Sequence, residues 1–146
     1  MFKDVLLPVD LSDPSSWHKA LPVAVAQCRA FGARLHVITV VPDFGMSIVG
    51  QYFPEGYEAK VGEAVMQALH RFVREHVPGD LKVQHIVAEG NIYEQILDAA
   101  RSIRCDLVVM GAHRPELKDY LLGPVPARVV RHAHCSVLVV REDDGG

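Results

Sequence analysis

The stretch that decides the fold runs from Asp106 to Arg141 and reads DLVVMGAHRPELKDYLLGPVPARVVRHAHCSVLVVR. It begins with a short apolar strand, Leu107 to Met110, which runs directly into Gly111. Gly123 follows twelve positions later, and we expect a helix to begin directly after it. The first turn of a helix exposes unpaired N–H groups and the positive end of the helix dipole, which favour an anion. Since a glycine has no Cβ to keep a ligand from the backbone, this layout is typical of a site for a phosphorylated ligand.

The rest of the chain alternates short apolar runs with segments of helical spacing. Gly32 is expected to end the first helix, and Asn91 with Glu94 forms a capping-box-like start for a later one. Residues 42–56 carry proline and glycine without a period and indicate a long loop. Strands are expected near residues 4–9, 34–41, 82–88, 106–111 and 136–141.

Strands separated by helices pair in parallel through right-handed crossovers, and their apolar character fits a sheet covered on both faces. We therefore expect an α/β fold: a three-layer, doubly wound, Rossmann-like parallel sheet of five strands. For this sheet we take the order 3-2-1-4-5. One domain should span residues 1–141, with a disordered acidic tail at 142–146. The residues expected to be buried first are Leu6, Val37, Ile38, Val108, Val109, Leu138 and Val139.

Composition excludes several classes of protein. The formal net charge of −3 and the lack of a Lys/Arg block argue against nucleic-acid binding. No apolar run approaches the length of a membrane span, and the N-terminus does not resemble a signal peptide. The three cysteines, Cys28, Cys105 and Cys135, lie in apolar contexts and are expected to be buried free thiols in a reducing compartment. A cytoplasmic protein without membrane insertion is the prediction.

Open parallel sheets bind ligands outside the carboxyl ends of their strands, where the strand order reverses. In the expected order this switch point lies between the first and fourth strands. Pro8, Val9 and Asp10 follow the first strand, and Met110 and Gly111 end the fourth. The glycine turn therefore falls where a ligand crevice is expected.

Four segments of the chain resemble the universal stress protein family: KDVLLPVDLSD, LHVITVV, VMGAHR and LLGPVPARVVRHAHCSVLVVR. The resemblance implies a homodimeric, cytoplasmic α/β protein. One branch of the family binds ATP through the pattern Gly-2x-Gly-9x-Gly-Ser/Thr. The form A-H-R-P-x4-Y-L-L-G is similar to the F/G-type subgroup, which binds nucleotides.

Applied to this chain, the resemblance implies that the ligand is ATP or AMP, bound with or without Mg²⁺. The adenosine end would meet Pro8, Asp10, Val37, Met110 and Gly111. The phosphate end would meet the loop that follows Gly111, then Gly123 and Val125. His113 stands where the family often has a histidine, and a scaffold role is expected for it.

The chain departs from the family pattern at the phosphate end. Arg114 stands where the second glycine belongs, the spacing to Gly123 is one residue shorter, and Pro124 replaces the Ser/Thr. Pro124 removes a hydroxyl and an N–H together, and Pro126 removes another N–H. Val125 and Ala127 remain as nearby main-chain donors. Arg114 and Lys118 offer side-chain charge that compensates for the lost donors.

Two other sites can be weighed from the residues. His132, His134 and Cys135 resemble a metal cluster, but no second pair with ligand spacing exists, so structural histidines are expected and no metal. No nucleophile with a base and an orienting group can be assembled, so no catalytic residue is assigned and any ATP hydrolysis or autophosphorylation should be slow.

Three functions stay open. The first is an adenine-nucleotide-binding regulatory protein of the stress response, acting through ligand-dependent contacts with a regulatory protein partner. The second is a dimeric interaction module of the same family, whose crevice is closed by Pro124 and Pro126. The third is a nucleotide-using enzyme. In each, the uncharged apolar strand Val137–Val140 is expected at a sheet edge, where it would pair with its twin in a homodimer.

Overall fold

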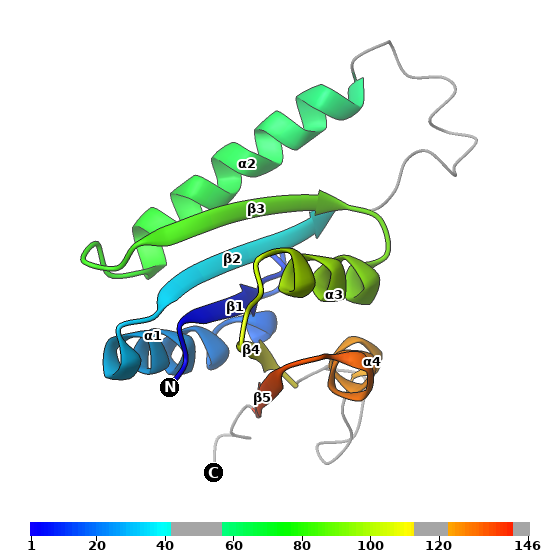
Figure 1. Cartoon of the computed structure of the whole chain (residues 1–146). Coiled ribbons are helices and arrows are strands. Elements are labelled where there is room, and N and C mark those ends of the chain that lie inside the picture. Colours follow the sequence, from blue (N-terminus) through cyan, green and yellow to red (C-terminus); the bar gives the residue numbers. More distant parts are fainter. Residues whose placement is uncertain (42–56, 113–122, 142–146) are drawn as a thin grey trace.

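The structure is a computed structural model that describes residues 1–41, 57–112 and 123–141. Its described elements are, in chain order, β1 (Asp4–Pro8), the 3₁₀ turn η1 (Pro14–Ser16), α1 (Ala20–Phe31), β2 (Arg34–Val41), α2 (Tyr57–His76), β3 (Val83–Glu89), α3 (Ile92–Ser102), β4 (Leu107–Gly111), α4 (Pro124–His132) and β5 (Ser136–Val140). The strands form one parallel sheet in the order β3-β2-β1-β4-β5 (Figure 1). The predicted sheet order is therefore confirmed. The predicted loop at 42–56 and tail at 142–146 lie outside the described residues.

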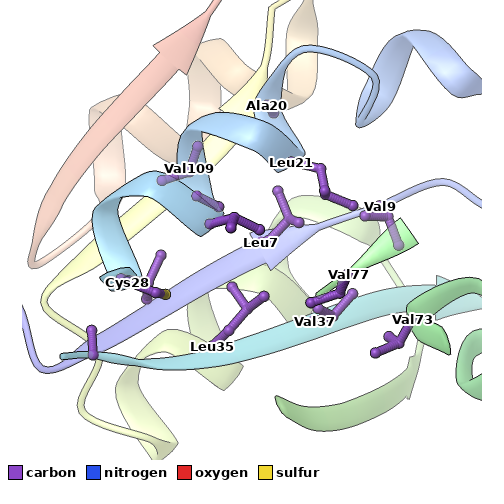
Figure 2. Close-up of a cluster of buried hydrophobic side chains, with 14 of the residues drawn as sticks. Leu7, Val9, Ala20, Leu21, Cys28, Leu35, Val37, Val73, Val77 and Val109 are labelled. Atoms are coloured by element: carbon purple, nitrogen blue, oxygen red, sulfur yellow. The ribbon is translucent and has the colours of Figure 1, made fainter. Parts of the chain in front are cut away.

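Two core clusters cover the two faces of the sheet, because side chains of successive strand residues point to opposite faces. On β1, Val5 and Leu7 belong to the first cluster, with residues of α1 and α2, and Leu6 belongs to the second, with residues of α3 and α4. Figure 2 shows part of the first cluster, with β1 and β2 side chains under α1 and with Val73 and Val77 beside them. The sheet is thus the middle of three layers, as predicted.

Burial confirms most of the predicted core. Leu6, Val37, Ile38, Val108 and Val109 are fully buried. The prediction was wrong for the last strand: Leu138 is 36% exposed, and Val139 is only partly buried. The reason is position, since β5 is an edge strand and α1 packs mainly over β1 and β4.

A short 3₁₀ turn separates β1 from the first helix. The side chain of Asp13 accepts a hydrogen bond from the Ser15 N–H and caps η1, not α1. Trp17 ends that 3₁₀ turn, and α1 starts at Ala20 without a side-chain cap. The chain therefore makes a tight turn before it becomes α-helical.

Two predicted helix ends are confirmed by local geometry. Gly32 follows α1 with a φ of 64°, and its N–H bonds to the Cys28 carbonyl. Asn91 caps α3, with its side chain accepting from the Glu94 N–H at 3.2 Å. Among the described residues, no helix is long and apolar enough to cross a membrane.

The left-handed backbone at Gly32 leads to a first prediction. Gly32→Ala should lower the free energy of unfolding by about 1–2 kcal/mol, because an added Cβ is strained at this φ although nothing lies within 4 Å of it. Gly62→Ala is the matched control: Gly62 lies inside α2 with equally open space, so alanine should stabilise by about 0.5–1 kcal/mol. Urea unfolding measures both. Shifts of the same sign would contradict the assignment.

Candidate functional site

The sheet divides at the predicted switch point. β1 pairs with β2 as far as Pro8 beside Ile38, and β4 pairs with β5 as far as Gly111 beside Val140. Between β1 and β4, however, the register ends at Leu6 beside Val108. The two central strands therefore separate before their carboxyl ends while each remains paired on its outer side. This division, which we call the split, lies where open parallel sheets bind ligands.

The chain after β1 holds Asp10 beside the split. The Asp10 N–H donates to Ser16 Oγ at 2.8 Å. The Ser16 hydroxyl in turn donates to the Asp13 carbonyl oxygen at 2.8 Å. One carboxylate oxygen of Asp10 accepts from the Ser12 N–H at 3.0 Å and from its hydroxyl at 2.7 Å. The described residues give the other oxygen no donor. Asp10 is exposed, so this oxygen can accept from a ligand.

Gly111 ends β4 against the backbone of η1. A Cβ built on Gly111 would lie 2.9 Å from the Ser15 carbonyl oxygen and 3.0 Å from that of Ser16. The missing Cβ was expected to make room for a ligand. The structure shows that it makes room for the chain's own 3₁₀ turn, which corrects the physical reason for this glycine. Beside it, Met110 is buried in the second core cluster.

α4 begins next to the end of β4, as predicted. Gly123 is its N-cap residue, and its N–H points to the Ala112 carbonyl oxygen at 3.4 Å. The Ala112 N–H bonds to the Val140 carbonyl at 2.9 Å. These bonds tie the helix start to the β4 end, while Pro124 is exposed to solvent.

Prolines leave the first turn of α4 with few amide donors. Pro124 and Pro126 have no N–H, and that of Gly123 is already bonded. The Ala127 N–H donates to the Gly123 carbonyl at 3.1 Å, inside the helix, so Ala127 was wrongly expected to serve a ligand. Val125 alone keeps an amide in the position where helix starts bind anions. The helix therefore supplies one main-chain donor.

Val37 lies one residue before the end of the pairing between β1 and β2. It pairs with Leu7 in mid-strand and is fully buried in the first core cluster, so its side chain cannot reach a ligand. Val40, nearer the carboxyl end of β2, is partly buried on the opposite face.

His113 and Arg114 lie outside the described residues. Ser12 and Ser16, which hold the Asp10 loop, were missed, although serines beside aspartates are typical of turns that bond their own backbone. Residues that the structure brings to one edge of the sheet are Pro8, Val9, Asp10, Met110, Gly111, Gly123, Pro124 and Val125.

The sequence model of the universal stress protein family matches residues 1–141. The chain belongs to this family. A universal stress protein of Thermus aquaticus is 33% identical over 146 residues, covering 97% of this chain and 100% of that protein. Universal stress protein G of Escherichia coli O157:H7 is 24% identical over 143 residues, covering 97% of this chain and all of that one.

Solved structures share the fold. A universal stress protein crystallised in complex with cAMP has a TM-score of 0.63 at 22% identity, covering 97% of this chain and 98% of that one. An Arabidopsis thaliana family protein crystallised with AMP bound has a TM-score of 0.63 at 15% identity, covering 97% and 93%. At such identities the likeness extends to the fold of the chain.

In the described ranges, no group of three or more His, Cys, Asp or Glu side chains is placed to hold a metal ion. His132 and His134 are exposed at the end of α4 and before β5. Cys135 instead faces Cys105 across 3.7 Å between their sulfur atoms.

The contact between η1 and Gly111 yields a second prediction. Gly111→Ala should lower the free energy of unfolding by about 1–3 kcal/mol without any ligand present, because its Cβ collides with backbone rather than with a flexible side chain. The matched control is Gly79→Ala, where nothing lies within 4 Å of an added Cβ. Thermal unfolding of the ligand-free proteins compares them. A tolerated alanine at Gly111 would return the position to a role in ligand approach alone.

Proposed function

We propose that this member of the universal stress protein family is a regulatory protein that binds an adenine nucleotide, ATP or AMP, in the split. The observation that carries the proposal is the separation of β1 and β4 beyond Leu6 and Val108. Ligand occupancy would then change contacts with a protein partner in the stress response.

The carboxylate of Asp10 can accept hydrogen bonds from the nucleoside end of the ligand. Asp10 is exposed, held through one oxygen by Ser12, and its second oxygen is available among the described residues. The ribose hydroxyls and the adenine amino group are donors that a carboxylate accepts well. Two acids in this loop, Asp10 and Asp13, disfavour phosphates there, so the phosphates are expected to point toward α4.

The phosphate end depends on side chains more than on the helix. The single amide of Val125 provides weak anion binding compared with a helix start that keeps all its amides. Arg114 and Lys118 stand in the intervening sequence and carry the charge that the prolines do not supply. We therefore propose that AMP and ATP bind with similar affinity unless these cations engage the outer phosphates.

Relatives with bound nucleotide support this assignment. The fold neighbours described above were crystallised with cAMP and with AMP. The ligands share an adenosine and differ in their phosphates. Adenosine is also the part of the ligand for which this chain keeps its acceptor, Asp10.

The rival function is a dimeric interaction module without a nucleotide. The two prolines at the start of α4 favour it, because they remove donors that a phosphate needs. Acid denaturation of the purified protein followed by chromatography separates the two functions. Near-stoichiometric adenine nucleotide supports the proposal. A protein that releases none, and shows no calorimetric binding of ATP or AMP with or without Mg²⁺, supports the rival.

Pro124 allows the phosphate end to be tested by a gain of affinity. Pro124→Ser restores an N–H and a hydroxyl at an exposed position, so ATP should bind about three- to thirtyfold more tightly while adenosine is unchanged. Pro124→Ala restores the N–H alone and should give the smaller part of this gain. Calorimetric titration compares the ligands. An equal gain for adenosine and ATP would show that the phosphates do not lie at this helix.

We also propose a homodimer through β5. This strand is an edge of the sheet, contains no charged residue, and leaves Leu138 36% exposed. Backbone groups of successive strand residues point to alternating sides, and the Val140 carbonyl accepts from the Ala112 N–H of the β4 side. The N–H and carbonyl of Val139 therefore face the outer edge, where a second copy can pair with them.

The outward-facing amide gives a test of the dimer. Val139→Pro removes that N–H and should convert the dimer into a monomer, whereas Val139→Thr keeps it and should leave the dimer intact. Leu138→Lys, which keeps every backbone donor, should weaken the dimer through an edge charge. Light scattering at micromolar concentration measures mass, with circular dichroism to check folding. A monomeric unmodified protein would contradict the proposal.

A further inference from the structure

Two cysteines meet at the opposite end of the sheet from the split. Cys105 lies two residues before the start of β4, and Cys135 directly precedes β5. Thirty positions separate them in sequence, yet their sulfur atoms lie 3.7 Å apart. The parallel register that pairs Leu107 with Ser136 brings the two strand starts side by side. The thiol pair is therefore set by the fold rather than by sequence proximity.

The two thiols differ in their access to solvent. Cys105 is 3% exposed, whereas Cys135 is only partly buried. An open pocket of about 660 Å³ lies over them and is lined also by Phe2, Asp106 and His134. Cys135 is therefore the more accessible of the two thiols, and the open pocket offers a small molecule an approach to it.

We propose that Cys135 and Cys105 form a redox-active pair that a low-molecular-weight disulfide, such as oxidised glutathione, converts into an internal disulfide. The Cys135 thiolate attacks one sulfur of oxidised glutathione, breaks its S–S bond and releases one glutathione thiol. The Cys105 thiolate then attacks the Cys135 sulfur of this mixed disulfide and releases the second glutathione. The protein loses two hydrogens and two electrons, and oxidised glutathione gains them.

The distance between the sulfurs favours the second step. A disulfide bond is about 2.0 Å long, so the sulfurs must approach by less than two ångströms from their separation of 3.7 Å. Cys28 has no such neighbour: it is buried in the first core cluster, on the other face of the sheet from Cys105 and Cys135. Cys28 is therefore an internal control for thiol reactivity.

The surroundings of the pair make the reaction slow at neutral pH. Burial raises the pKa of the Cys135 thiol; the hydrogen bond with Cys105 opposes this effect, and the charge of Asp106 adds to it. Burial likewise raises the pKa of Cys105. His134 is the other titratable side chain that lines the pocket. Since the thiolate is the nucleophile, the rate should rise about tenfold from pH 7 to pH 8.

Treating the full-length protein with oxidised glutathione tests the proposal. Intact mass should fall by two hydrogens, and peptide mapping should show a Cys105–Cys135 link, with Cys28 still free. Cys28→Ala should behave in the same way. Cys135→Ser should form no internal disulfide, and Cys105→Ser should stop at a glutathione adduct on Cys135.

Two results would overturn it. One is an unmodified protein that keeps three free thiols, or accumulates the glutathione adduct on Cys135 without going further, under conditions that oxidise a dithiol peptide. The other is a disulfide that joins two chains or includes Cys28. Because Cys105 is buried, thermal melting of each reduced variant first establishes that it is folded.

Discussion

The rest of the structure depends on one constraint: the central parallel strand must be buried from water on both faces. β1 presents Val5 and Leu7 to one face and Leu6 to the other, and all three are fully buried. Helices must therefore pack on both sides, and right-handed crossovers then make all five strands parallel. Parallel strands end at one edge, so the candidate ligand residues meet there without any local motif that gathers them. The location of the site follows from the core.

Periodic and local features were predictable from the sequence. Alternating apolar runs located every strand to within a residue or so, and Gly32 and Asn91 ended and began helices through bonds that involve only neighbouring residues. Handedness rules predicted parallel strands, but they do not by themselves select the order 3-2-1-4-5. Exposure of Leu138 was not predictable in this way, because it depends on how far α1 extends over an edge strand.

The site was harder to predict than the fold, because a shift of one or a few residues changes its chemistry. Val37 and Val40 belong to the same apolar run, and only the pairing with β1 shows which of them approaches the edge. The residue at which α4 begins decides which amides are free to bind a ligand. Because Gly123 is the N-cap, the Ala127 N–H donates to the Gly123 carbonyl within the helix. Gly111 could be predicted as a position that needs a glycine, but the group that an added Cβ would meet, the carbonyl of Ser15, comes from a turn far away in sequence.

The split between β1 and β4 also has a mechanical meaning. It divides the sheet into two hydrogen-bonded blocks, β3-β2-β1 and β4-β5, joined near the carboxyl edge by side-chain packing and by the contact of η1 with Gly111 rather than by a strand ladder. The block with β5 carries the outer edge of the sheet. Under the proposed function, a ligand that bridged Asp10 and the start of α4 would contact both blocks at once and hold them together across the split. The position of the edge strand β5 would then depend on whether a ligand occupies the split, although β5 does not line the split.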